Sequence, residues 1–201
     1  MTSAPVARDG TDHRLGRVGK GSGLARSVLS PCGLAGDHPW KRYPAALMTD
    51  SSRDPLTSAL STVPGLHLAS FLLDEMVAHC LSAYPEEGCG LLVGDPATST
   101  VTSVCPTRNL AGSAQVYTVD PSEHLRIDRA AETEGHAVIG VFHSHTHTDA
   151  FPSPTDVAQA PDPSWHYVLV SLRHEVASIR SYRIVDGLAA EEEIEVSLLS
   201  D

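Results

Sequence analysis

The run Ala137–Phe142, which leads directly into His143-Ser144-His145, constrains the fold of this chain more than any other feature. Its residues, Ala-Val-Ile-Gly-Val-Phe, are typical of a β-strand because most are apolar and several are β-branched or aromatic. Side chains two residues apart in a strand point to the same face of the sheet. If the strand continues past Phe142, both imidazoles lie on one face, where they can bind one metal ion.

Apolar spacing and turn residues outline the other elements of the chain. Apolar residues recur at helical spacing over about 71–84, and Pro121 at a first helical position predicts a second helix to about Glu134. The order of all elements predicts an α/β (α+β) fold, in which two main helices flank a mixed or mainly antiparallel sheet. Apolar or alternating runs predict further strands at Leu66–Ala69, Gly88–Gly94, Val101–Pro106, Gln115–Val119, Trp165–Leu172, Glu175–Val185 and Glu193–Leu199.

Basic residues and glycines gather in the first sixty residues. That segment contains eight of the fourteen Lys and Arg and seven of the fifteen Gly, and its apolar residues follow neither a helical nor a strand period. Such a segment buries too little surface to offset the entropy of ordering it. We therefore expect residues 1–63 to form a disordered extension, or an extension that is mis-annotated because translation starts at Met48, and residues 64–201 to form one domain.

The remaining composition excludes several classes of protein. The net charge of −11 argues against a nucleic-acid binder, and no stretch approaches the ~20 apolar residues of a membrane span. The polar N-terminus does not match a secretory signal. The four cysteines form no C-x-x-C pair and are too few to indicate a disulfide framework. We expect a soluble, cytoplasmic protein that binds neither nucleic acid nor membranes.

A helix start follows the two histidines and supplies a carboxylate. Ser153-Pro154-Thr155-Asp156 has the pattern of a capping box, so Asp156 alone would be interpreted as a capping residue. Together with the two imidazoles, however, it completes a three-ligand zinc site with an open position for water. Such a site also requires a general base, for which Glu86 and Glu87 are candidates, and a donor to the developing oxyanion, for which Ser153 is a candidate.

These segments in combination resemble a known family. Glu87-Gly88-Cys89-Gly90-Leu91, His143-x-His145 and Ser153-x-x-Asp156 are similar to the signature of the JAMM (MPN-plus) metalloproteases. The resemblance implies a cytidine-deaminase-like mixed sheet and one Zn²⁺ held by His143, His145 and Asp156. It also implies that Glu87 is the general base and that Ser153 steadies the tetrahedral intermediate.

The chain departs from the family pattern after the second histidine. Many members have Pro there, whereas this chain has Thr146 and then His147. His147 continues the strand parity, so it is a candidate for a third imidazole ligand. The alternatives are that His147 lines the substrate groove or is simply solvated, and we favour these because the chain must turn near Asp149.

The substrate expected from the resemblance is a conjugated carrier protein. Tyr84–Gly90 and Arg180–Gly187 look like segments of small, stand-alone family members. These include a hydrolase of cysteine biosynthesis that releases cysteine from the C-terminal Gly of a ubiquitin-like sulfur-carrier protein ending in Gly-Gly. The alternatives are a deubiquitinase-like isopeptidase acting on lysine conjugates and a non-catalytic MPN scaffold. Scaffolds usually lack one or more of the five site residues, and this chain has all five.

Overall fold

The computed structural model describes Cys32 and residues 65–198. The expectations for the remainder of residues 1–63, including the alternative start at Met48, lie outside the described residues. The elements are β1 (Leu66–Ala69), α1 (Ser70–Ala83), β2 (Cys89–Asp95), β3 (Thr100–Thr107), α2 (Pro121–Thr133), β4 (Ala137–His145), α3 (Pro154–Gln159), β5 (His166–Ser171), β6 (Ser178–Val185), β7 (Leu188–Glu192) and β8 (Ile194–Ser197).

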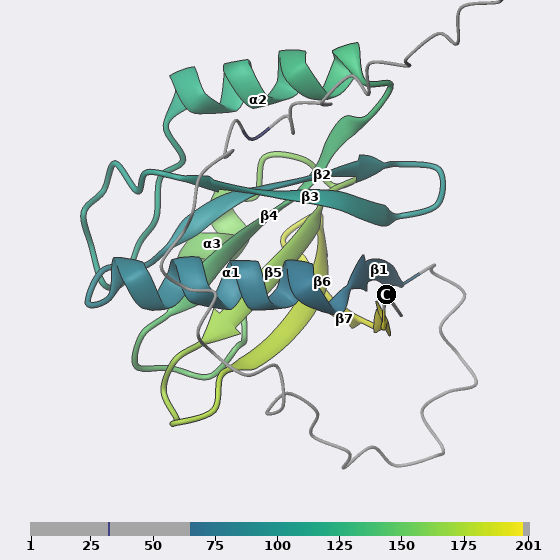
Figure 1. Cartoon of the computed structure of the whole chain (residues 1–201). Helices are drawn as coiled ribbons and strands as arrows, with labels where there is room; N and C mark the ends of the chain where they lie inside the picture. Colours follow the sequence, from purple (N-terminus) through teal and green to yellow (C-terminus); the bar gives the residue numbers. More distant parts are fainter. Residues whose placement is uncertain (1–31, 33–64, 199–201) are drawn as a thin grey trace, which may run out of the picture.

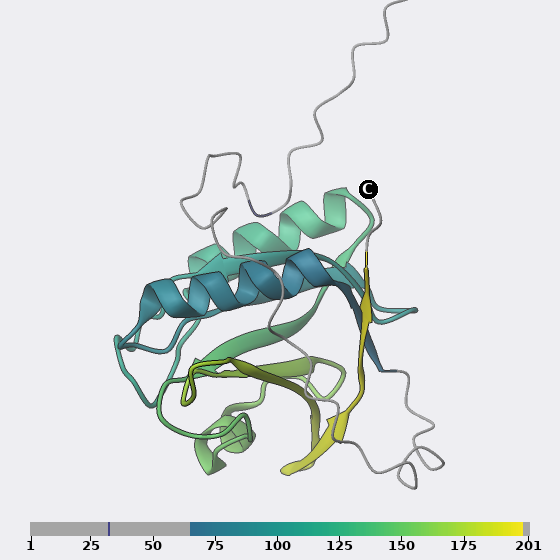
Figure 2. The same cartoon turned by 60° about the horizontal axis from the view of Figure 1, so that its bottom comes forward.

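One mixed sheet organises these elements. Its eight strands lie in the order β7-β6-β5-β4-β2-β3-β1-β8. The pairs β4–β5, β1–β3 and β1–β8 are parallel, and the other neighbouring strands are antiparallel. In Figure 2 the yellow β8 runs beside the blue β1, so the first and last strands meet at one edge. The predicted mixed sheet with two main helices is confirmed, and β4 extends to His145 as the parity argument requires.

The two long helices cover opposite faces of this sheet. Alternate residues of a strand face opposite sides, so neighbouring residues of β2 pack against different helices. Leu92 of β2 packs with the α1 side chains Met76 and Cys80, whereas its neighbour Leu91 packs with Ile127 of α2. Figure 1 shows α1 and α2 on either side of the β2–β3 hairpin. Within residues 65–198, none of the helices is both long enough and apolar enough to span a membrane.

Two segments differ from the sequence expectations. The predicted strand Gln115–Val119 does not form. Only Val119 is paired, in an isolated antiparallel bridge with Asn109, and the Asn109 side chain bonds to the Val116 carbonyl and the Thr118 N–H. The hairpin partner β7 was not predicted, although Asp186-Gly187 is a turn signal. The φ angles of Asp186 and Gly187, 51° and 75°, are those that a two-residue hairpin turn requires.

The cysteines also differ from expectation. The cysteines are too few to indicate a disulfide framework, yet Cys32 and Cys105 are joined by a disulfide with a Cα–Cα distance of 5.0 Å. No local spacing could indicate this bond, because 73 residues separate the two positions. Cys80 and Cys89 are free and buried.

Candidate metal centre

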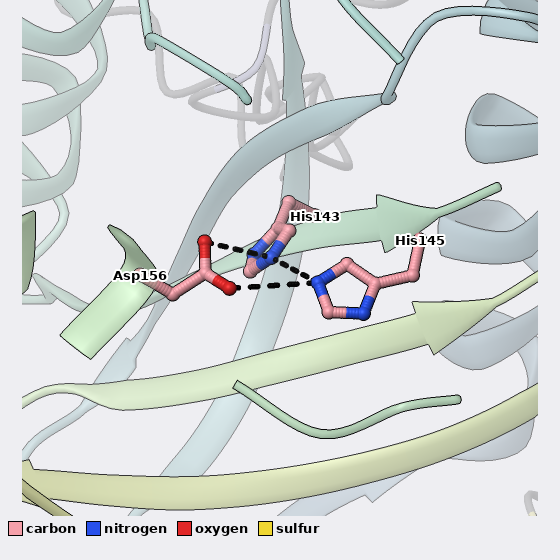
Figure 3. A group of neighbouring side chains, drawn as sticks. All are labelled: His143, His145 and Asp156. Atoms are coloured by element: carbon pink, nitrogen blue, oxygen red, sulfur yellow. Dashed lines mark hydrogen bonds and ion pairs between the residues drawn. The ribbon is translucent and has the colours of Figure 1, made fainter. Parts of the chain in front are cut away.

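Three side chains converge where β4 ends and α3 begins. The Nε2 atoms of His143 and His145 lie 3.2 Å apart. The carboxylate of Asp156 reaches both imidazoles, with Oδ1 at 3.4 Å from His143 Nε2 and Oδ2 at 3.5 Å from His145 Nε2. Figure 3 shows the two rings projecting from one strand toward the carboxylate at the helix start. The structure thus brings together all three predicted ligands.

The spacing of these atoms fits a tetrahedral ion. Ligands about 2.0–2.1 Å from such an ion lie roughly 3.3–3.4 Å from one another. The two imidazole nitrogens lie 3.2 Å apart, and a different oxygen of the Asp156 carboxylate lies near each of them, at 3.4 and 3.5 Å, so these separations are close to that value. Two imidazole nitrogens and one carboxylate oxygen are also a donor set that zinc accepts. The residues present therefore fit a metal ion.

Neighbouring groups orient the two imidazoles. His145 Nδ1 donates to the Asp149 carbonyl at 2.9 Å, which turns the ring so that Nε2 faces Asp156. The His143 ring is buried and stacks on Tyr117, with ring centroids 4.2 Å apart and an angle of 19° between the planes. The His143 Nδ1 atom has no hydrogen-bond partner among the described residues, so on that side the ring is held by stacking, while Nε2 contacts Asp156.

Asp156 has two structural roles at once. Its backbone N–H donates to Ser153 Oγ at 3.2 Å, and the Ser153 N–H donates to Asp156 Oδ2 at 2.6 Å, which completes the predicted capping box. The cap fixes the Asp156 rotamer, so the same carboxylate is held against both histidines. Interpreting Asp156 as a cap and interpreting it as a ligand are therefore compatible.

Charges within the three-residue cluster compensate one another. Burial alone would raise the pKa of Asp156, but hydrogen bonds with His143 and His145 outweigh it and hold that pKa far below its ordinary value. Burial lowers the pKa of His143, which favours the neutral, ligating form. Although burial opposes it, the contacts of His145 with Asp156 and with the Asp149 carbonyl raise the pKa of His145. Because a histidine must be neutral to bind a metal ion, metal binding at His145 is coupled to the release of its proton.

Glu87 lies just before β2 and is almost fully buried, with 3% exposure. Burial raises its pKa to about 7; the charge of His145 acts in the opposite direction and that of Asp156 adds to the rise. These interactions place Glu87 within electrostatic reach of the ligand cluster. The neighbouring Glu86 is exposed, so of the two predicted base candidates only Glu87 has the environment of a functional carboxyl.

His147 lies outside the cluster. Strand β4 ends at His145, and the exposed His147 ring instead pairs with Thr146 Oγ1 at 2.7 Å through Nδ1. Its ring centroid is 6.4 Å from that of Tyr84. The possibility of a third imidazole ligand is therefore wrong in this structure, since the turn after His145 removes His147 from the ligand face.

Comparison with known proteins identifies the family. Residues 70–185 match the model of Prok-JAB, the prokaryotic homologues of the JAB domain. The chain belongs to this family. The predicted JAMM resemblance and the predicted class of enzyme, a JAMM-type hydrolase, are thereby confirmed.

Individual relatives of this JAB-domain chain have related names. It is 41% identical over 139 residues to the CysO-cysteine peptidase of Mycobacterium tuberculosis, which covers 67% of this chain and 93% of that protein. It is 36% identical over 111 residues to the desampylase of Haloferax volcanii, which covers 53% and 80%. A solution structure of a Desulfitobacterium hafniense protein matches with a TM-score of 0.62 and 34% identity, covering 67% of this chain and 94% of that one.

The sequence does not predict three residues that lie around this JAB-type site. Tyr117 stacks on His143, Asn109 bonds to the backbone at Glu87, and Ser144 bonds to Gly88. Only Ser144 has a local signal, because it stands between the two histidines of the motif. Tyr117 and Asn109 lie on a segment that resembles a short strand and a turn, and nothing in their spacing points to the site.

Proposed function

We propose that this chain is a zinc-dependent peptidase that hydrolyses the bond between the C-terminal glycine of a ubiquitin-like sulfur-carrier protein and cysteine. The observation that carries the proposal is the convergence of His143, His145 and Asp156, with donor atoms 3.2–3.5 Å apart, in electrostatic reach of the buried Glu87. The CysO-cysteine peptidase, alignable over 93% of its length, supports the substrate class.

One zinc ion would be held by His143 Nε2, His145 Nε2 and a carboxylate oxygen of Asp156. When bound, zinc lowers the pKa of a water molecule and polarises a carbonyl group. The protein side chains keep the donor atoms in place without a large rearrangement, since the capping box and the Asp149 carbonyl already fix them.

Glu87 would move the protons of the reaction. Its pKa of about 7 lies near neutral pH, so the carboxylate can accept a proton from the attacking water and return it to the departing cysteine amine. The balance of the step is simple. One water is consumed, the C–N bond breaks, the glycine gains a carboxylate and cysteine leaves with its amine protonated.

Ser153 would stabilise the negative charge that develops on the carbonyl oxygen. Its Oγ accepts a hydrogen bond from the Asp156 N–H at 3.2 Å, which leaves the hydroxyl proton available for donation. The site needs an extended, narrow substrate segment because its ligands are buried. A carrier tail ending in Gly-Gly fits this requirement, since glycine has no Cβ.

A second candidate function is isopeptidase action on a carrier joined to a lysine side chain. The 36% identity to the desampylase of Haloferax volcanii favours it. The scissile amide has the same chemistry in both cases, so the five site residues do not distinguish them. A non-catalytic scaffold is disfavoured, because all five residues of the signature are present.

Mass spectrometry of two defined substrates tests the proposal. One is a sulfur-carrier protein with cysteine peptide-bonded to its terminal glycine, and the other is the same carrier joined to a lysine side chain. We expect the zinc-loaded protein to release cysteine from the first, chelator to stop the release, and Glu87→Gln to lower turnover by about 10²–10⁴-fold. Glu86→Gln, the exposed neighbour, is the matched control and keeps wild-type turnover.

Two outcomes would overturn parts of the proposal. Full activity of Glu87→Gln removes Glu87 as the base. Cleavage of the lysine conjugate alone, with the cysteine adduct left intact, replaces the peptidase assignment by the isopeptidase one.

A further inference from the structure

Glu87 precedes the sheet, so strand pairing does not hold its backbone. Strand β2 begins at Cys89, two residues later. Both backbone polar groups of Glu87 bond instead to the segment 109–119, which connects β3 to α2 and is called here the 109–119 loop. The Glu87 N–H donates to the Ser113 carbonyl at 2.8 Å, and the Glu87 carbonyl accepts from Asn109 Nδ2 at 3.0 Å. The position of Glu87 therefore depends on this loop.

The Asn109 side chain also closes the loop on itself. Its Nδ2 donates to the Val116 carbonyl at 3.3 Å, and its Oδ1 accepts from the N–H groups of Ala111 and Thr118, both at 3.0 Å. One amide thus satisfies backbone groups at both ends of the loop and at Glu87. Asn is suited to this role because its side chain carries two donors and an acceptor.

The same loop contacts the metal side of the site. The Ala114 carbonyl accepts from Thr146 Oγ1 at 3.3 Å, directly after β4, and the ring of Tyr117 stacks on His143. The loop therefore touches both the candidate base and a candidate ligand. A loop in this position sets how Glu87 faces the ligands.

We propose that Asn109 is a positioning residue for Glu87, holding the general base in register with the metal centre through the 109–119 loop. This inference rests on the proposed function, in which Glu87 transfers protons. Misplacing a reacting group by about 1 Å can cost ~10²-fold in rate. The hydrogen bonds of the Asn109 side chain go to none of the three candidate ligands. Removing this side chain should therefore lower kcat and leave metal binding unchanged.

The test uses two variants of the full chain. Asn109→Asp keeps the acceptor for Ala111 and Thr118 but cannot donate to the Glu87 carbonyl. Asn109→Ala is neutral and removes every bond, which separates the added charge from the lost donor. The matched control is Gln115→Glu, since the exposed Gln115 lies in the same loop and undergoes the same amide-to-carboxylate change.

We expect both Asn109 variants to lower kcat by about 10–100-fold, with KM changed less than about threefold and one zinc still bound. Amide hydrogen exchange at Glu87, measured in metal-free protein, should accelerate at least about tenfold, while exchange at Val141 in β4 stays unchanged. Only Asn109→Asp should also move the acid limb of the pH profile to higher pH, because its carboxylate raises the pKa of Glu87. Gln115→Glu should match wild type in every measurement.

The inference and the proposed function fail differently. If wild type cleaves the adduct and both Asn109 variants retain its kcat, the inference is wrong and the function stands. Loss of zinc or of overall stability in parallel with kcat also overturns the inference, since Asn109 would then be structural. A wild type that leaves both substrates intact overturns the proposed function, and unchanged Glu87 exchange in the variants would independently overturn the Asn109 contact.

Discussion

Ser144 and Gly88 are joined by two hydrogen bonds, one from each backbone amide. The Gly88 N–H donates to Ser144 Oγ at 2.9 Å, and the Ser144 N–H donates to the Gly88 carbonyl at 2.9 Å. Ser144 stands between the two candidate imidazole ligands, and Gly88 directly follows Glu87. This pair therefore fixes β4, which carries the imidazoles, against the segment that carries the candidate base.

Replacing Ser144 should destabilise the protein. Both Ser144 and Gly88 are buried, so Ser144→Ala leaves the Gly88 N–H without an acceptor, at a cost of about 1–3 kcal/mol. Urea denaturation of the metal-free protein measures this. Ser82→Ala is the control, because its hydroxyl bonds to His79 on the exposed side of α1, and it should change the free energy of unfolding by less than about 0.5 kcal/mol. Equal stability of the two variants would contradict the role of Ser144.

Metal binding should distinguish Asp156 from His147. Asp156→Ala removes one of three converging donors and should abolish stoichiometric zinc binding. His147→Ala should retain one ion per chain, because His147 is exposed and its Nδ1 pairs with Thr146. Elemental analysis of dialysed protein measures both. Loss of zinc from His147→Ala would restore this residue as a ligand.

The candidate ligand set was predictable because its signals are local. Side chains at positions i and i+2 of a strand share a face, and Ser153 and Asp156 form a capping box that needs no distant partner. Both rules operate within a few residues. Strand β4 and the start of α3 therefore behave as their sequences predict, and only the convergence of the two segments required the fold or the family resemblance.

The surroundings of the site were not predictable, because they depend on long-range contacts. Asn109 and Glu87 are 22 residues apart, and Cys32 and Cys105 are 73 residues apart. The alternating pattern of Gln115–Val119 favours a strand, yet the Asn109 side chain bonds to the Val116 carbonyl and the Thr118 N–H, and only Val119 is paired, in an isolated bridge. Side-chain capture of this kind leaves no periodic signal in the sequence.

The pH dependence of stability should report the burial of Glu87. Burial raises the pKa of its carboxyl from 4.5 to about 7 in the folded protein, so between these pH values the folded chain holds a proton that the unfolded chain releases. The stabilisation from this group is complete below about pH 4.5 and is lost as the pH rises to about 7.

The measurement compares three metal-free proteins. The free energy of unfolding of wild type should fall, relative to Glu87→Gln, by about 3 kcal/mol across that window. Glu86→Gln should follow the wild-type curve, because Glu86 is exposed. Parallel curves for wild type and Glu87→Gln would mean that the Glu87 carboxyl titrates normally.

The segment between the candidate ligands His145 and Asp156 is held by Tyr182 of β6. Its hydroxyl donates to the Ala150 carbonyl at 2.7 Å, and both residues are buried. The preceding residue, Asp149, accepts the bond from His145 Nδ1. Removing the hydroxyl in Tyr182→Phe should therefore release the support of His145 and weaken zinc affinity by about tenfold, the lower end of the effect of groups that orient ligands.

Tyr167→Phe is the matched control for this prediction. Tyr167 is also buried, and its hydroxyl donates to the Asp162 carbonyl at the same 2.7 Å, but that loop carries no candidate ligand. Tyr182→Phe loses one hydrogen bond, whereas Tyr167→Phe loses two, because the Asp162 N–H also donates to the Tyr167 hydroxyl at 3.2 Å. The stability losses should therefore be about 1 kcal/mol for Tyr182→Phe and about 2 kcal/mol for Tyr167→Phe. Competition with a chelator should then show weaker zinc binding for Tyr182→Phe alone. Equal affinities would mean that the loop keeps its conformation without Tyr182, and that the capping box at Ser153 and Asp156 suffices to hold the ligands.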